Sequence, residues 1–218
     1  MDQPQLVAPS HGRVVDEAKT AAPSRDAADL AKSAEREKWR ASLREANQHV
    51  WLHGPHGSGD NLDASLKRNS AFIKRLKQTN LADAKDALVK EVQLLSLTKY
   101  LDELIPSIPE ILWKATTLKD RYAAIEILCA LHARFSGSEF TEPLLKVMEQ
   151  EIVPPPPKSQ DASNEQAQKE AALVARQRSL LRGVTEMVLV GLVGPMTLSE
   201  GVCAPVLNWL YAVSYTHL

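Results

Sequence analysis

Apolar residues recur along most of the chain at intervals of three and four positions, the spacing of one face of an α-helix. The same spacing returns over residues 29–52, 81–95, 97–115, 118–135, 140–153, 162–193 and 197–211. No segment alternates apolar and polar residues over a useful length, as a half-buried strand would. The pattern therefore predicts an all-α protein. It is clearest over 62–77, whose predicted core face consists of Leu62, Leu66, Asn69, Phe72, Ile73 and Leu76.

Residues able to accept a hydrogen bond from a helix's first turn stand before several of these segments. Asp60, Asn80 and Thr117 are each followed three positions later by an aspartate. A carboxylate at that point suits the positive end of the helix dipole. We therefore predict that these three residues are the N-caps of the helices that follow them.

Prolines and glycines predict where other helices end or bend. Pro106 and Pro109 each remove a backbone donor and clash with the preceding turn, so we expect them to kink or split the helix over 97–115. Gly137 is predicted to end the next helix. Four consecutive prolines then open a polar loop at about 153–163.

The fold class predicted from these elements is a HEAT-like superhelical stack of antiparallel helical hairpins. Helices of ordinary length with short connections favour such a stack over a four-helix bundle. Residues 1–27 mix proline, charge and alanine without a hydrophobic period, and we expect a disordered leader there. Residues 28–213 are predicted to form the helical domain. Residues 214–218 continue no pattern, and we expect them to be a non-native tail.

Composition narrows the classes of function. The chain holds 26 basic and 27 acidic residues, which excludes a globally basic nucleic-acid binder but leaves room for a local basic patch. Cys129 and Cys203 lie far apart and match no disulfide or metal spacing, as in a reducing compartment. The longest strongly apolar segment, 187–194, is too short to span a bilayer. We expect a soluble, intracellular protein without membrane contact.

Catalytic or metal-binding patterns are sparse. Three histidines have spacings of four and three residues: His49, His53 and His56. Only an aspartate in the next loop could complete a metal-ligand set with them, so a solvated loop is favoured over a metal site. His132 lies on an apolar face beside Cys129, and nothing nearby would orient it as a catalytic base. We predict a core histidine there. The sequence therefore predicts no catalytic residue, no cofactor and no metal, and hence no enzyme.

Charge is distributed unevenly along the chain. Residues 36–80 hold nine basic and four acidic residues, whereas residues 81–152 hold eight basic and twelve acidic ones. A cluster on one predicted helix supplies the candidate residues for contact with RNA or a protein partner: Lys67, Arg68, Lys74, Arg75 and Lys77. A solvated helix face is the commoner use of such a cluster. Phe72 could offer a base-stacking surface, but its position beside Ile73 and Leu76 favours the core.

Four blocks of the chain match a known family, in the order LREANQHVW, LDASLKRNSAFIKRLK, VQLLSLTKYLDELIPSI and AAIEILCALHARFSGSEFTEPLLK. They resemble the first middle domain of the regulator of nonsense transcripts two family, also called the up-frameshift suppressor two family. This domain is of the translation initiation factor four-gamma middle type, a stack of antiparallel helical hairpins related to HEAT repeats. The resemblance covers about Leu43 to Tyr211.

The resemblance implies a scaffold or adaptor domain of a nonsense-mediated mRNA decay factor, which binds proteins without catalysis. In the family, the full-length protein links an up-frameshift helicase, an RNA-recognition-motif partner and a surveillance kinase. It also implies a cytoplasmic or perinuclear location and a domain that is truncated here. The small number of cations at 67–77 predicts weak RNA binding, and we expect the fragment to be monomeric. The alternative is a direct RNA-binding helical module of a translation or cap-complex factor.

Overall fold

The computed structural model describes residues 25–57, 62–78, 80–152 and 164–193. These residues are helical almost throughout, which confirms the all-α prediction. The α-helices are α1 (Arg25–His53), α2 (Leu66–Leu76), α3 (Leu81–Leu94), α4 (Leu101–Lys114), α5 (Leu118–Ser136), α6 (Glu142–Glu151) and α7 (Asn164–Leu189). A 3-10 turn η1 (Thr98–Tyr100) precedes α4, and a π-helical turn η2 (Gly137–Thr141) joins α5 to α6.

Several predicted features fall outside the described residues, among them the helix over 197–211, the tail over 214–218 and the polar part of the proline-rich loop. The predicted leader lies outside them up to residue 24, and its last three residues belong to the start of α1. Contacts divide the chain into two units between Arg36 and Glu37. The first unit contains an exposed ion pair between Lys32 and Asp29, 3.5 Å apart. The second unit contains the hydrophobic core.

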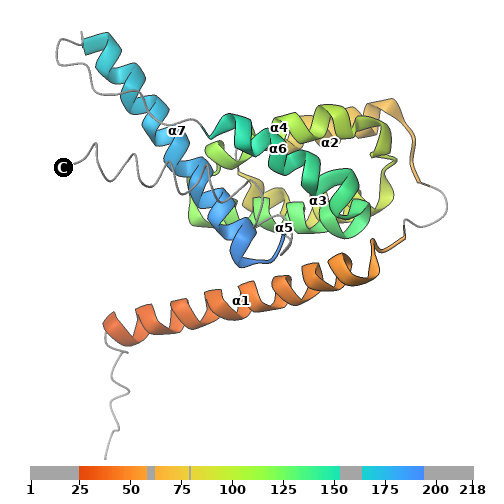
Figure 1. The fold of residues 1–218 in the computed structure, drawn as a ribbon, viewed down its shortest axis with the longest axis horizontal. Helices are drawn as coiled ribbons and strands as arrows, with labels where there is room; N and C mark the ends of the chain where they lie inside the picture. Colours follow the sequence, from red (N-terminus) through yellow and green to blue (C-terminus); the bar gives the residue numbers. More distant parts are fainter. Residues whose placement is uncertain (1–24, 58–61, 79, 153–163, 194–218) are drawn as a thin grey trace, which may run out of the picture. The chain divides into compact units, whose positions relative to one another are not determined.

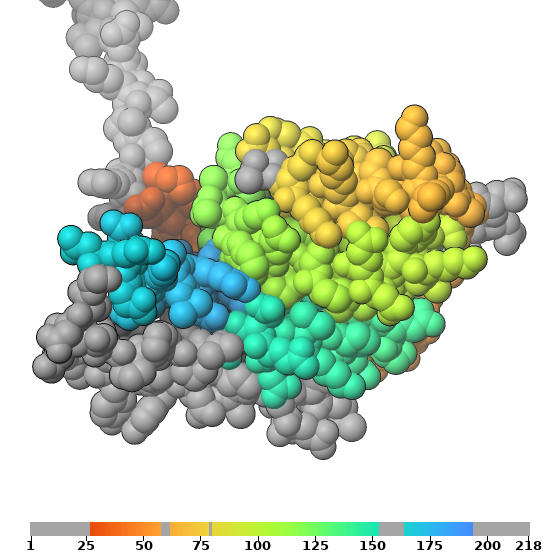
Figure 2. All heavy atoms as spheres, turned by 90° about the horizontal axis from the view of Figure 1, so that it is seen from above, coloured from red at the N-terminus to blue at the C-terminus, as the bar shows by residue number. Residues whose placement is uncertain are grey.

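Helices α2 to α7 form two layers of a HEAT-like stack (Figure 1). In one layer α3 contacts α5 and α5 contacts α7, and in the other α4 contacts α6. The hairpin partners α2 and α3, and likewise α4 and α5, also contact each other. Figure 2 shows α2, α4 and α6 following one another on a single face as orange, yellow-green and teal bands. The predicted fold class is therefore confirmed.

The core face predicted for residues 62–77 is confirmed in its second half and wrong in its first. Phe72, Ile73 and Leu76 are buried, but Leu66 is 68% exposed. The helix begins only at Leu66, with Ser65 at the N-cap position, so residues before it have no helical register. An isolated parallel β-bridge between Asp63 and Leu95 is the physical reason. Its two backbone hydrogen bonds, both 2.9 Å long, hold the chain extended up to the start of α2.

Helix α4 is continuous through both of its prolines, so the predicted split is wrong. The carbonyl group that Pro106 leaves without an amide partner belongs to Asp102, which is exposed and open to water. On the other side of the helix, Leu104, Ile108 and Leu112 have no solvent exposure. Burial of these side chains is worth about 1.5–3 kcal/mol each and outweighs the hydrogen bonds that the prolines remove.

Asp120 takes part in closing the beginnings of both α3 and α5. Thr117 Oγ1 accepts a hydrogen bond from the Asp120 amide at 3.1 Å, as predicted for the cap of α5. Asn80 stands at the N-cap position of α3, as predicted, but its backbone is left-handed (φ of 71°) and its side chain makes no cap hydrogen bond. Instead, Asp120 Oδ1 accepts from the Ala82 amide at 3.1 Å and thereby caps α3 from the neighbouring hairpin. Asp60, the third predicted cap, lies outside the described residues.

Side chains from other helices also close the helix C-termini. The buried guanidinium of Arg134 in α5 donates to the Val92 carbonyl in the last turn of α3. Gln177 of α7 donates to the Glu151 carbonyl at the end of α6, with a distance of 2.9 Å. Burial lowers the pKa of Arg134, yet a cation at this place faces the negative end of the α3 dipole.

Three donors on one face of α1 meet the end of α7. Arg44 Nε donates to the Leu189 carbonyl at 2.9 Å, Asn47 Nδ2 to the Val190 carbonyl at 2.8 Å, and Trp51 Nε1 to the Gly191 carbonyl at 3.2 Å. One turn earlier, Arg40 forms two hydrogen bonds with the Glu186 carboxylate, 2.7 and 2.9 Å long. We call this set the α1–α7 seam.

Two glycines allow the close packing at the seam. Gly191 has a φ of 70°, and the Leu192 amide reaches back to the Met187 carbonyl at 2.9 Å, which is a Schellman ending of α7. Gly137 lies against the ring of Trp51, and a Cβ atom there would be 2.0 Å from a ring carbon. The prediction that Gly137 follows the end of α5 is thus confirmed, and its reason is close approach.

Replacement of Leu66 and Ile73 by alanine separates the exposed from the buried part of the predicted core face. Ile73→Ala should lower the free energy of unfolding by about 2–5 kcal/mol because it leaves a cavity. Leu66→Ala should change it by less than about 0.5 kcal/mol. Urea denaturation followed by circular dichroism measures both. Equal losses would contradict the start of α2 at Leu66.

The pair Arg40–Glu186 should couple the two helices energetically. In a double-mutant cycle with alanine at both positions, we expect a coupling energy of about 1–3 kcal/mol, because both side chains are largely buried and form two charged hydrogen bonds. The exposed pair Lys169–Glu165 within α7 is the matched control, with about 0.3–0.5 kcal/mol expected. Similar coupling for the two pairs would mean that the α1–α7 seam does not hold the ion pair away from water.

Candidate functional site

The candidate site is the charged face of α2, and the buried side of that helix determines how its cations are directed. Phe72, Ile73 and Leu76 pack into the core. Four of the five cations predicted as contact residues therefore lie on the remaining sides of α2, and Lys77 directly follows the helix. Two of the five are paired arginines, one is a loosely paired lysine, and two are lysines without an ion-pair partner among the residues that the structure describes.

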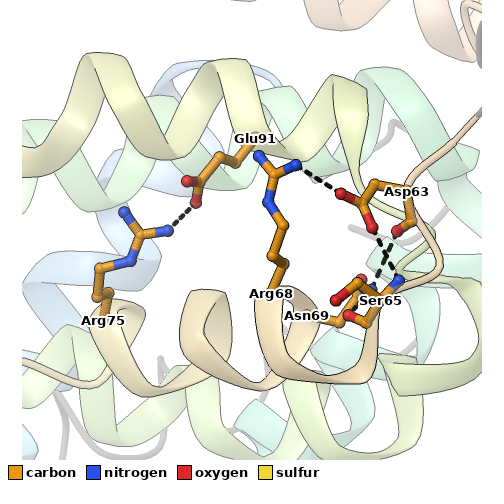
Figure 3. Close-up of polar contacts among 6 residues, drawn as sticks. All are labelled: Asp63, Ser65, Arg68, Asn69, Arg75 and Glu91. Carbon is orange, nitrogen blue, oxygen red and sulfur yellow. Dashed lines mark hydrogen bonds and ion pairs between the residues drawn. The ribbon is translucent and has the colours of Figure 1, made fainter.

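Arg68 and Arg75 are both paired with acidic residues of this chain (Figure 3). Arg75 forms an ion pair with Glu91 of α3, which ties the two helices of the hairpin together, and the hydrogen bond that Arg75 donates to the Glu91 carboxylate raises the pKa of Arg75. Arg68 donates to Asp63 at 2.5 Å, just before the helix begins. These two guanidinium groups are therefore engaged within the domain.

Asp63 organises the turn that leads into α2. Its Oδ1 accepts a hydrogen bond of 2.8 Å from the Ser65 amide, while Oδ2 accepts from Arg68. The Ser65 amide, followed by Arg68, lowers the pKa of this carboxyl group. Asp63 therefore remains an anion at neutral pH and neutralises one of the five cations.

Asn69 fixes the same turn from inside the domain. It is fully buried, and its Nδ2 donates to the Asp63 carbonyl at 3.1 Å and to the Ser65 carbonyl at 2.8 Å. Each of these carbonyls also accepts a backbone hydrogen bond, from the Ser96 and Asn69 amides respectively, so the side chain of Asn69 adds a second donor to each. The apolar spacing placed Asn69 on the core face, but its role as a hydrogen-bond donor to the turn depends on the β-bridge.

Lys67 and Lys74 remain exposed on the solvent side of α2, and neither has an ion-pair partner within the described part of the chain. Lys77 lies 4.0 Å from Glu103 of α4, at the limit of an ion pair. The sequence did not indicate Glu91 and Glu103 as partners, because they belong to other helices. The patch is thus much less basic than the sequence indicated.

The other candidate groups have no arrangement suited to catalysis or metal binding. The ring of His49 lies 4.4 Å from that of His53 and 5.7 Å from that of His56, between ring centres. Among the residues that the structure describes, no group of three or more His, Cys, Asp or Glu side chains could hold a metal ion. These histidines are exposed at the end of α1 and in the loop that follows.

The buried pair Cys129 and His132 is part of the core, as predicted for the histidine. Burial raises the pKa of the Cys129 thiol to about 12, so it stays protonated. Burial lowers the pKa of His132 to about 4, and its Nδ1 lies 2.7 Å from Thr141 Oγ1. A neutral imidazole and a protonated thiol do not make an activated nucleophile. Cys203 lies outside the described residues.

The fold indicates the class of protein domain to which this chain is similar. The chain has 33% sequence identity and a TM-score of 0.57 to the solved N-terminal mIF4G domain of Upf2 from Saccharomyces cerevisiae, over 71% of this chain and 48% of that one. That protein is described as involved in the degradation of mRNAs containing premature stop codons. The described helices therefore form a domain of the translation initiation factor four-gamma middle type. No protein-family model matches the chain.

Sequence relatives then point to a particular group of proteins. The chain is 39% identical over 131 residues to nonsense-mediated mRNA decay protein 2 of Saccharomyces cerevisiae, covering 60% of this chain and 12% of the relative. The protein of that name in Schizosaccharomyces pombe is 34% identical over 143 residues, which cover 61% of this chain and 14% of the relative. Regulator of nonsense transcripts 2 of Mus musculus is 31% identical over 161 residues, which cover 72% of this chain and 11% of the relative. The predicted resemblance is confirmed, and the chain spans only a small part of these relatives.

Among the helices that the structure describes, none combines the length and the apolar character that a transmembrane span requires.

Asn69 tests whether the turn before α2 depends on buried hydrogen bonds. Asn69→Ala should lower the free energy of unfolding by about 1–3 kcal/mol, because the two buried hydrogen bonds from the side-chain amide to the Asp63 and Ser65 carbonyls are lost. The neighbouring exposed Ser70 gives the matched control, and Ser70→Ala should change it by less than about 0.5 kcal/mol. Thermal and urea denaturation measure both variants. A loss at Asn69 no larger than at Ser70 would contradict the role of the amide.

Proposed function

We propose that this chain is a non-catalytic, protein-binding scaffold domain of a nonsense-mediated mRNA decay factor. Its sequence relatives carry that process in their names, and the fold matches a domain of one of them. One observation favours a protein over RNA as the ligand: Arg68 is paired with Asp63, and Arg75 is paired with Glu91. This pairing removes two of the five cations that an RNA-binding surface would use.

The charge left on α2 supports only weak RNA binding. Lys67 and Lys74 are seven residues apart, which is about 10 Å along the helix axis. Together they would neutralise about two phosphates of a single strand, and the logarithm of the binding constant would then fall with that of the salt concentration with a slope of about −1.4. Phe72, the aromatic residue considered for base stacking, has no solvent exposure. The direct RNA-binding module is therefore the weaker candidate.

The proposal extends to the location and the partners of the longer factor. We infer that the longer factor works in the cytoplasm, including its perinuclear region, and links an up-frameshift helicase, an RNA-recognition-motif protein and a surveillance kinase. In that assembly this domain contributes binding surfaces and spacing, and it requires no cofactor. The absence of an activated nucleophile at Cys129 and His132 supports a domain without catalysis.

Titration with RNA tests the proposal. We expect the full chain to bind a fluorescently labelled 20-nucleotide single-stranded RNA with a dissociation constant above about 100 μM at physiological salt, and with a shallow salt slope. Fluorescence anisotropy at several salt concentrations measures both quantities. The variant Lys67→Glu/Lys74→Glu should abolish the residual binding. The variant Lys99→Glu/Lys146→Glu carries the same change of charge on other elements and should not.

A dissociation constant below about 1 μM, with a salt slope steeper than about −4, would require more than five phosphate contacts. That result would contradict the scaffold proposal and favour the RNA-binding module.

A further inference from the structure

The solvent side of α2 brings together a large apolar side chain, two small residues and two lysines. Leu66, at the start of the helix, is 68% exposed although large apolar side chains are usually buried. Ser70 and Ala71, one turn further on, are exposed and small. Lys67 and Lys74 lie on the same side and have no ion-pair partner among the residues that the structure describes. We call these five residues the α2 face.

The helical positions bring the α2 face together. Residues 67, 71 and 74 follow the spacings of four and three that align side chains on one side of a helix, and residues 66 and 70 form the adjacent row. The opposite side is fixed by the burial of Phe72, Ile73 and Leu76, so α2 cannot turn this face inward. Figure 2 shows α2 at the surface of the layer that it shares with α4 and α6.

The neighbouring charges are already neutralised, which leaves the two lysines for a partner. Arg68 and Arg75 lie on the flank of α2 toward α3 and are paired there with Asp63 and Glu91. Lys77, the last of the five cations, lies near Glu103. Charge complementarity therefore calls for an acidic partner with carboxylates about 10 Å apart, the rise of seven helical residues.

We propose that the α2 face is the docking site for an acidic amphipathic helix of a partner protein. Ser70 and Ala71 allow the backbone of that helix to approach closely, Leu66 packs against one of its apolar side chains, and Lys67 and Lys74 pair with its carboxylates. RNA would leave Leu66 uncovered, and the α2 face would contact only two of its phosphates. This inference rests on the proposed scaffold function and identifies the class of partner that one of its surfaces binds.

The test uses two labelled 18-residue helical peptides of leucine and alanine that differ only in carrying either glutamate or lysine at positions seven residues apart. We expect the full chain to bind the glutamate peptide more tightly than the lysine peptide in fluorescence anisotropy at physiological salt. Two exposed ion pairs of ordinary strength correspond to a difference of about two- to thirtyfold. The variant Lys67→Glu/Lys74→Glu should reverse the preference, and Lys99→Glu/Lys146→Glu should leave it unchanged.

The apolar contact has its own variant. Leu66→Ser should weaken binding of both peptides by about five- to thirtyfold, because it removes the side chain that the peptide covers. Since Leu66 is exposed, this variant should fold normally, and circular dichroism checks that it does.

Three outcomes would overturn the inference. Equal binding of the two peptides, or no effect of the Lys67 and Lys74 reversal, would show that the α2 face does not select an acidic helix. Absence of binding to both peptides and to the 20-nucleotide RNA would contradict the proposal that the α2 face docks a helix. The proposed scaffold function would still stand, because other surfaces could serve it. Tight RNA binding that is lost in the same reversal would overturn both proposals.

Discussion

The structure depends on the closure of its helix ends by side chains from other helices. Each α-helix leaves four amide and four carbonyl groups without partners inside itself, and burial of such groups is costly unless they are bonded. Here Asp120 of α5 closes the start of α3, and Arg134 of α5 closes its end. Three donors of α1 do the same for the end of α7. These bonds can form only when the helices are packed in one arrangement.

The same constraint determines the character of α2. The β-bridge between Asp63 and Leu95 and the buried amide of Asn69 together set the first residue of the helix. The core then sets its rotation through Phe72 and its neighbours. As a result, the arginines of the basic cluster are directed toward acids of the same domain, whereas two lysines and Leu66 are directed outward. A cluster that looks uniform in the sequence has two different physical roles.

This division of roles agrees with a domain whose work is binding. A HEAT-like stack gains its stability from contacts between successive hairpins, which leaves the outer sides of the helices available for partners. The fold is similar to that of the Upf2 mIF4G domain, and the sequence is similar to a small part of nonsense-mediated mRNA decay proteins. Buried Cys129 and His132 are held in uncharged forms, which suits a core and not an active site.

The sequence by itself determined the fold class, most helix positions and the cap of α5 by Thr117, because these depend on spacing and neighbours along one helix. It also placed Phe72, Ile73 and His132 in the core correctly. Tertiary structure alone decided which residues close the other helix ends, whether α4 continues through Pro106 and Pro109, and which cations of α2 are free. Most of these depend on a residue of another helix, such as Glu91 opposite Arg75. Spacing within one helix carries no information about such partners, because the packing of helices against one another brings them together.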